Sequence, residues 1–201
     1  MIMIIINTFF YVYIDTWPLV TLSGASASAS VGIATVANIV GEVSKAIWDC
    51  LVEDFMPVPT KQDWSAIAEG FFQRWNFPNC LGSIDGKHVV IQAPPNSGSL
   101  FRNYKHAFSI VLLAVVDADY LFRMVDVGGY GRNSDGGTLN NSPFGEALKD
   151  GTLDLPDDCT ISGAEHRGLL PHVFVGDEAF PLRAPAASFP WITPHQGQKG
   201  V

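Results

Sequence analysis

The stretch Ser109-Ile-Val-Leu-Leu-Ala-Val-Val116 is apolar at every position after its first residue. A strand with one face in water alternates polar and apolar side chains, so this continuous run predicts a central strand covered on both faces of a sheet. Asp117-Ala-Asp119 follows as an expected hairpin turn. β-Branched and aromatic residues predict the strands of this sheet at Val89–Gln92, Phe108–Val116, Leu121–Val127 and Val173–Val175.

Two amphipathic helices are expected ahead of the sheet. Apolar residues recur at helical spacing from Val36 to Leu51, with Thr35 available as the N-cap. A second set shares one helical face from Trp64 to Trp75, and Thr60 can cap that helix. The pair is either a helix-turn-helix that contacts DNA or a helical pair packed on the following domain. The scarcity of basic residues on both faces favours the second alternative.

Composition and charge narrow the class of protein. At 201 residues, with 47% hydrophobic and 16% charged residues, the chain reads as globular with one main domain. The formal charge of −8, with only 12 scattered Lys and Arg residues, argues against this chain holding DNA by itself. Cys50, Cys80 and Cys159 are an odd number at wide spacings, which predicts neither a disulfide framework nor a zinc site and fits a reducing compartment.

The first thirty residues allow three interpretations. They are almost wholly apolar through Ile14 and are followed by small residues, as in a signal peptide. No Lys or Arg precedes Lys45, however, and the apolar run is short for a membrane span. A non-native start, a signal or anchor, and a core strand therefore stay open, with a membrane location not favoured. Alternating Ala and Ser at 25–30 indicate a linker.

Three aspartates lie beside glycine near predicted strands. Asp85 opens the apolar segment in Gly82-Ser-Ile-Asp-Gly-Lys-His-Val-Val-Ile91, and Asp177 follows the strand His172-Val-Phe-Val175. Asp135 lies in a loop after the hairpin. Carboxylates from separate elements are the ligands that Mg²⁺ and Mn²⁺ prefer, so Asp85 and Asp177 are predicted as the core pair and Asp135 as a third ligand.

Other polar residues are assigned plainer roles. A lone Asp is more often a turn-former or helix cap, which is the role expected for Asp117, Asp119, Asp157 and Asp158. Along a strand Lys87 and His88 face opposite ways, so at most one points with Asp85, and Glu178 points away from Asp177. There is no Gly-x-Ser-x-Gly elbow and no evident pairing of a histidine with a cysteine, which disfavours nucleophilic catalysis. The histidines expected to be structural or solvent-facing are His106, His166, His172 and His195.

Four sequence blocks occur in an order that resembles a known family. They are Gly82–Val89, Asn103–Asp117, Val127–Asp135 and Val175–Leu182. From about residue 31 to about residue 183 the chain resembles the Harbinger transposase-derived nuclease family of the DDE superfamily. This resemblance implies an RNase H-like mixed α/β sheet with flanking helices, preceded by a small helix-turn-helix-like segment. It also implies a divalent-metal-dependent DNA nuclease in the nucleus that depends on a separate Myb-like DNA-binding partner.

The resemblance places the metal ligands on Asp85, Asp135 and Asp177, with Asp85 and Asp177 as the principal catalytic residues. In the family a glutamate follows a few tens of residues after the last of these aspartates, inside a basic helix. No Glu follows Pro181 here. The expected organisation is therefore an apolar start and linker at 1–30, a helical segment at 31–79, and a nuclease domain at 80–201 that is incomplete at its C-terminus.

Three functions are compatible with these observations. The leading hypothesis is a Mg²⁺- or Mn²⁺-dependent DNA endonuclease that hydrolyses phosphodiesters, weakened or inactive because the final acid is missing. The alternative is a non-catalytic, domesticated transposase-derived protein that binds a Myb-like or chromatin partner. An unrelated metal phosphohydrolase would also use strand-end aspartates, but it leaves the Asn103–Asp117 and Val175–Leu182 blocks unexplained.

Overall fold

The computed structural model describes residues 32–180, so the predicted apolar start and linker and the segment after Phe180 lie outside the described residues. The described chain divides into two compact units. One unit comprises residues 32–57, 88–110 and 130–132, and the other comprises 58–87, 111–129 and 133–180. Within the described residues, no helix has the length and apolar character needed to cross a membrane.

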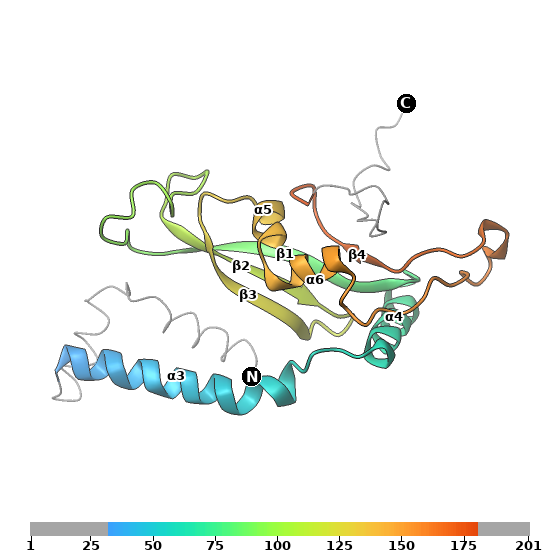
Figure 1. Ribbon diagram of the computed structural model, residues 1–201, viewed down its shortest axis with the longest axis horizontal. Coiled ribbons are helices and arrows are strands. Elements are labelled where there is room, and N and C mark those ends of the chain that lie inside the picture. Colours follow the sequence, from blue (N-terminus) through green and yellow to red (C-terminus); the bar gives the residue numbers. More distant parts are fainter. Residues whose placement is uncertain (1–31, 181–201) are drawn as a thin grey trace. The chain divides into compact units, whose positions relative to one another are not determined.

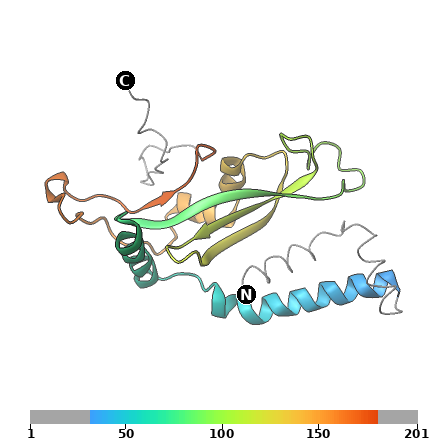
Figure 2. The same cartoon turned by 180° about the vertical axis from the view of Figure 1, so that it is seen from behind.

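A four-stranded mixed sheet forms the centre of the fold. Its strands are β1 (Cys80–Val90), β2 (Ser109–Val116), β3 (Phe122–Tyr130) and β4 (Val173–Val175), in the order β3-β2-β1-β4 (Figures 1 and 2). β4 runs parallel to β1. β2 runs antiparallel to β1, since the Ile91 N–H donates to the Phe108 carbonyl beyond one end of the pair. This mixed α/β sheet with flanking helices confirms the predicted fold class and is consistent with an RNase H-like fold.

The central position predicted for the apolar run is confirmed. β2 lies between β1 and β3, and residues Ser109–Val115 are all buried. Leu112 and Leu113, which point to opposite faces, are 8% and 0% exposed. A strand buried on both faces has no position where a polar side chain is favoured, which is why its sequence does not alternate.

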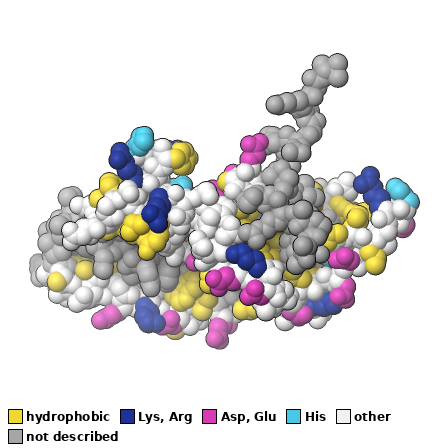
Figure 3. Space-filling model, turned by 45° about the horizontal axis from the view of Figure 1, so that its top comes forward, with side chains coloured by type: hydrophobic (Ala, Val, Ile, Leu, Met, Phe, Trp, Pro, Cys, Tyr) yellow, Lys and Arg dark blue, Asp and Glu magenta, His cyan; other side chains and the backbone are white. Residues whose placement is uncertain are grey.

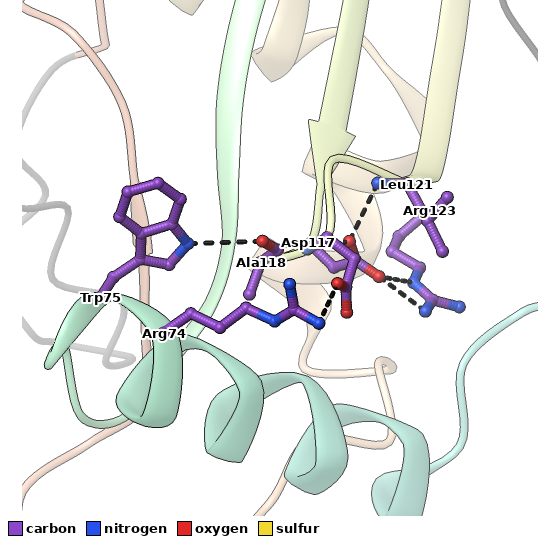
Figure 4. Close-up of polar contacts among 7 residues, drawn as sticks. Arg74, Trp75, Asp117, Ala118, Leu121 and Arg123 are labelled. Carbon is purple, nitrogen blue, oxygen red and sulfur yellow. Dashed lines mark hydrogen bonds and ion pairs between the residues drawn. The ribbon is translucent and has the colours of Figure 1, made fainter.

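The turn between β2 and β3 is held by one buried carboxylate (Figure 4). Asp117 accepts hydrogen bonds from the N–H groups of Asp119 and Leu121 at 2.8 and 2.9 Å. Its other oxygen accepts from the Arg123 guanidinium at 2.9 and 2.6 Å. Arg74 pairs with Asp119, and the Trp75 indole donates to the Ala118 carbonyl. The turn-forming role predicted for Asp117 is confirmed.

Two helices precede the sheet, as predicted. α3 spans Ile33–Phe55 and α4 spans Lys61–Trp75. Thr60 caps α4 in a reciprocal capping box with Asp63, as the sequence indicates. The expected Thr35 cap is wrong: α3 begins at Ile33, after Gly32, with no side-chain cap. Helical periodicity does not fix the first residue of a helix to within one turn. Thr35 is a residue type that often caps helices, but here it lies inside the first turn of α3.

Aromatic side chains join two helices of the second unit to β4. Phe174 of β4 makes edge contacts with Trp64 of α4 and Phe144 of α6, at centroid distances of 5.7 and 5.4 Å. α5 (Asp135–Asn140) and α6 (Pro143–Asp150) lie together on one face of the sheet in both views (Figures 1 and 2). Beyond them a short 3₁₀ turn, η1 (Glu165–Arg167), precedes β4. The segment that holds Asp135 was expected to be a loop and forms α5 instead.

Two strand boundaries also differ from expectation. β1 begins at Cys80 rather than Val89, and β3 continues through Gly128 and Gly129 to Tyr130. Glycine and aspartate disfavour strands when considered alone, but ladder pairing with a neighbour overrides this preference. Gly129 has a packing reason to lack a side chain, because a Cβ there would lie 2.8 Å from the Thr138 methyl group.

Candidate active site

The register of two parallel strands relates Asp85 to Asp177. In the β1–β4 pair, Gly82 aligns with Phe174 and Ser83 aligns with Val175. Two residues further along each chain stand Asp85 and Asp177. If the same register is extended by those two residues, the two aspartates occupy matching positions at the carboxyl end of the parallel pair. Parallel neighbours lie about 4.8 Å apart, so carboxylates at such positions are within reach of one shared cation.

Asp85 lies inside β1 and not at the head of a strand, which corrects the expected placement. The chain from Cys80 to Ile84 is almost entirely buried, whereas Asp85 is exposed. Its Oδ1 accepts a hydrogen bond from the Gly86 N–H at 2.8 Å. Pairing with β4 is recorded only as far as Ser83, so Asp85 follows the end of the paired segment rather than the end of the strand.

Asp135 approaches β1 because Gly86 has no side chain. Asp135 is the first residue of α5, and the preceding Ser134 caps the helix by accepting the Gly137 N–H at 3.1 Å. A Cβ on Gly86 would overlap the Asp135 carboxylate, and even the Asp135 Cβ would be only 2.9 Å away. The structure thus brings Asp135 against the residue that follows Asp85, although on a helix rather than in the expected loop.

Asp177 lies in a tight turn after β4. Its Oδ1 accepts the Ala179 N–H at 2.9 Å, and its carbonyl accepts the Phe180 N–H at 3.2 Å. Gly176 allows the turn to close, because a Cβ there would lie 2.8 Å from the Phe180 ring and 3.0 Å from Ile84. Asp177 and Glu178 are both exposed. The buried Phe180 anchors this turn to the core and leaves the Asp177 carboxylate at the surface.

A complete metal-binding cluster is not formed by these side chains as they stand. Among residues 32–180, no three His, Cys, Asp or Glu side chains come together closely enough to hold a metal ion. Asp85 is related to Asp135 through Gly86 and to Asp177 through the strand register, but the three carboxylates do not converge on one point. The donor chemistry nevertheless suits a hard divalent cation, since all three groups are carboxylates and two are exposed.

The residues beside Asp85 have separate roles. Lys87 is exposed, while His88 is half-buried and its Nδ1 forms a hydrogen bond with the Ser109 hydroxyl at 2.9 Å. His88 therefore supports the local structure rather than presenting its ring to solvent. Burial raises the pKa of the Cys80 thiol to about 11, so this cysteine is a protonated core residue.

Sequence reasoning missed a thiol–imidazole contact at the amino end of β4. The Cys159 Sγ lies 4.0 Å from the His172 Nε2 and donates to the Asn79 Oδ1 at 3.3 Å. The two residues are brought together by backbone bonding between Cys159 and Leu170. No local sequence pattern links them, because the intervening loop has no regular period. The thiol proton is held by an amide oxygen, which makes the contact structural in character.

Comparisons with known proteins bear on this site. Residues 84–200 match the family described as DDE superfamily endonuclease. The chain is also 34% identical over 143 residues to an Arabidopsis thaliana protein named "Protein ALP1-like". That match covers 70% of this chain but only 32% of the relative, so the chain spans about a third of the relative's length. No solved structure matches the chain significantly.

Proposed function

Because the chain belongs to the DDE superfamily endonuclease family, as its resemblance to Harbinger transposase-derived nucleases predicts, we propose that it hydrolyses DNA phosphodiesters with a divalent cation. One observation carries the proposal: β1 and β4 pair in parallel with Ser83 opposite Val175, a register that would align Asp85 with Asp177 if it continued for two more residues. The approach of Asp135 to Gly86 adds a third carboxylate beside the first. The matched region, 84–200, begins one residue before Asp85.

The three carboxylates fit Mg²⁺ or Mn²⁺ by their chemistry. Asp85, Asp135 and Asp177 would hold the cation, and waters and substrate phosphate would fill the remaining positions. When bound, such a cation activates the attacking water and neutralises charge that develops on the phosphate. The chain's own part is to fix the carboxylates on β1, α5 and the β4 turn, while the exposure of Asp85 and Asp177 leaves one side open to a DNA backbone.

Partners and location follow as further proposals. The formal charge of −8 supports dependence on a separate DNA-binding protein, and the family resemblance favours a Myb-like partner and a nuclear location. The match covers only 32% of the Arabidopsis thaliana relative. The activity of the whole protein is therefore part of the same proposal.

The alternative function is a non-catalytic, domesticated protein that binds a Myb-like or chromatin partner. One observation supports it: the described residues contain no three-group metal cluster.

The test is cleavage of supercoiled plasmid by the purified chain with Mg²⁺ or Mn²⁺, together with Mn²⁺ binding by calorimetry. We expect Asp85→Asn and Asp177→Asn to abolish both cleavage and binding. Asp150→Asn, an exposed acid at the end of α6, is the matched control and should change neither. Gly86→Ala should behave like Asp135→Asn, because its methyl group displaces that carboxylate.

Two outcomes would contradict the nuclease. Cleavage that survives in the Asp85→Asn/Asp177→Asn protein would exclude these residues from the mechanism. Absence of both Mn²⁺ binding and cleavage in the wild-type chain, with retained binding to a Myb-like protein, would establish the alternative instead.

A further inference from the structure

The loop between β1 and β2 contains a rigid turn built on a buried asparagine. The Asn103 Oδ1 accepts the N–H groups of Lys105 and Ala107 at 3.0 and 3.1 Å. Its amide donates to the buried Ser109 hydroxyl at 3.0 Å, and its backbone N–H donates to the Ala107 carbonyl at 2.8 Å. With both its side chain and its backbone bonded, Asn103 fixes the turn, and residues 104–106 are exposed at its tip.

Basic side chains surround this turn. Arg102, Lys105 and His106 are exposed on the turn itself. Arg132 joins them from the end of β3, since its N–H donates to the Leu100 carbonyl at 3.2 Å. Gly131 permits this approach, because a Cβ there would overlap the Phe101 carbonyl. We call Arg102, Tyr104, Lys105, His106 and Arg132 the basic tip. The sequence had suggested scattered cations, and the fold gathers these.

The cations of the basic tip are not neutralised by the described protein. The ion pairs of residues 32–180 use Lys45, Lys61, Arg74 and Arg123, and none uses Arg102, Lys105 or Arg132. The sequence contains no acidic residue from Gly86 to Val116 or from Val127 to Ser134. In a chain with a net charge of −8, this is a local reversal of sign. Figure 3 shows one group of Lys, Arg and His side chains with no acidic side chain among them, at the upper left.

An exposed aromatic ring stands among these charges. Tyr104 is 74% exposed, with the Lys105 ammonium 5.3 Å from its ring centroid. The His88 ring packs edge-on against it at 5.7 Å, which orients the tyrosine without covering it. Cations that follow a backbone, together with an aromatic side chain that meets bases, are the combination used to bind single-stranded nucleic acid.

We propose that the basic tip binds DNA, with Arg102, Lys105 and Arg132 on phosphates and Tyr104 against an unpaired base. The proposal rests on the proposed function in taking DNA as the ligand, and it names a substrate-binding surface that consists of residues other than the three aspartates. A protein partner is disfavoured, because protein interfaces need an apolar centre and the large exposed apolar side chains of residues 100–108 and 130–132 are two tyrosines, Tyr104 and Tyr130.

The test is fluorescence anisotropy of labelled single-stranded and duplex oligonucleotides, titrated with the full chain in EDTA at several NaCl concentrations. EDTA removes cleavage, so binding is measured alone. For the duplex, each of Arg102→Ala, Lys105→Ala and Arg132→Ala should reduce the slope of log affinity against log salt by about 0.9. The triple variant should bind about tenfold or more weakly near 100 mM salt. A matched control removes three exposed cations elsewhere: Lys45→Ala/Lys149→Ala/Arg167→Ala.

The tyrosine is tested on the single strand. Tyr104→Ala should weaken binding about 5- to 100-fold, whereas Tyr104→Phe should bind nearly as well as wild type. If Tyr104→Ala weakens binding and Tyr104→Phe does not, the aromatic ring contacts the base, because neither substitution changes the charge of the protein. Equal binding by Tyr104→Ala and wild type would overturn the role of the ring.

The remaining outcomes separate this inference from the nuclease proposal. It is overturned if the tip triple variant binds like wild type, if the control triple variant loses as much, or if wild type shows no binding at 20 mM NaCl. If binding depends on the basic tip but wild type does not cleave with Mn²⁺, the nuclease fails and the binding surface stands. If Asp85→Asn/Asp177→Asn binds normally without cleaving, both proposals are supported.

Discussion

Asp117 shows how much one buried side chain can organise. Its carboxylate serves two backbone N–H groups and the Arg123 guanidinium, and its side chain is only 5% exposed. Removing it would leave a partly buried cation and two amide groups without their acceptor. Such losses are costly, since a buried group pays its full desolvation when its partner is deleted.

We therefore expect Asp117→Ala to lower the free energy of unfolding by about 3 kcal/mol. Urea denaturation followed by circular dichroism measures the change. Asp119→Ala is the control, because the Asp119–Arg74 pair is about half exposed and should contribute less than about 1 kcal/mol. Equal destabilisation by the two variants would show that the turn, and not the buried carboxylate, determines the effect.

His172 predicts a dependence of stability on pH. Burial lowers the pKa of this ring below its ordinary value, although nearby Asp158 opposes the shift. The unfolded chain then binds a proton at a higher pH than the folded chain does. The free energy of unfolding should accordingly fall as pH drops below about 6.5, the ordinary value for histidine.

The measurement is urea denaturation at pH 7.5 and pH 5.5 for wild type and His172→Gln. Other groups titrate identically in both proteins, so the difference isolates His172. The wild-type chain should lose more stability between the two pH values than the variant does. A loss of the same size in both would mean that the folded protein protonates the ring as readily as the unfolded chain.

At the scale of elements, the sequence predicts the helices and strands that have a long hydrophobic pattern. It does not predict the strand boundaries that depend on pairing with a neighbouring strand. β2 was evident because burial on both faces leaves a continuous apolar run, and α4 because Thr60 precedes a clear helical face. The first half of β1 was missed because Gly82 and Asp85 look unfavourable until a partner strand is present. The acids beside glycine marked the candidate site, but their alignment depends on a register that only the folded sheet contains.

The two helix starts give a direct comparison of capping. Thr60→Ala removes the hydroxyl that accepts the Asp63 N–H, while the Thr60 backbone N–H can still donate to the Asp63 carboxylate. The loss should lower the free energy of unfolding by about 1 kcal/mol. Thr35→Ala, inside the first turn of α3, should be neutral or slightly stabilising, since Ala has the higher helix propensity. Thermal unfolding of both variants provides the test. If Thr35→Ala lowered the free energy of unfolding more than Thr60→Ala does, Thr35 would be acting as a helix cap.

For the whole molecule, the division into two units cuts through strands. β1 and β2 each begin in one unit and end in the other, so neither unit holds a complete central strand. Unfolding one unit alone would break a strand in its middle and expose the ladder bonds of the remainder. We expect one cooperative transition rather than two.

Hydrogen exchange can measure this directly. The amides of Ile110 and Val115 lie in different units on the same strand. Their free energies of opening should agree and should match the global value. Markedly faster exchange at Ile110 would show that the first unit opens separately.

The register shift in the β1–β4 pairing matters for any redesign that moves these strands into another protein. Cys80 pairs with Val173, a separation of 93 positions, whereas Ser83 pairs with Val175, a separation of 92. Extended as far as Asp85, the first separation would place it opposite Glu178, whereas the second would place it opposite Asp177. The irregularity near Leu81 therefore shifts the register of β1 against β4 by one residue. If the two strands were grafted onto another protein without this irregularity, all the acidic residues would be retained. The residue aligned with Asp85 would nevertheless change.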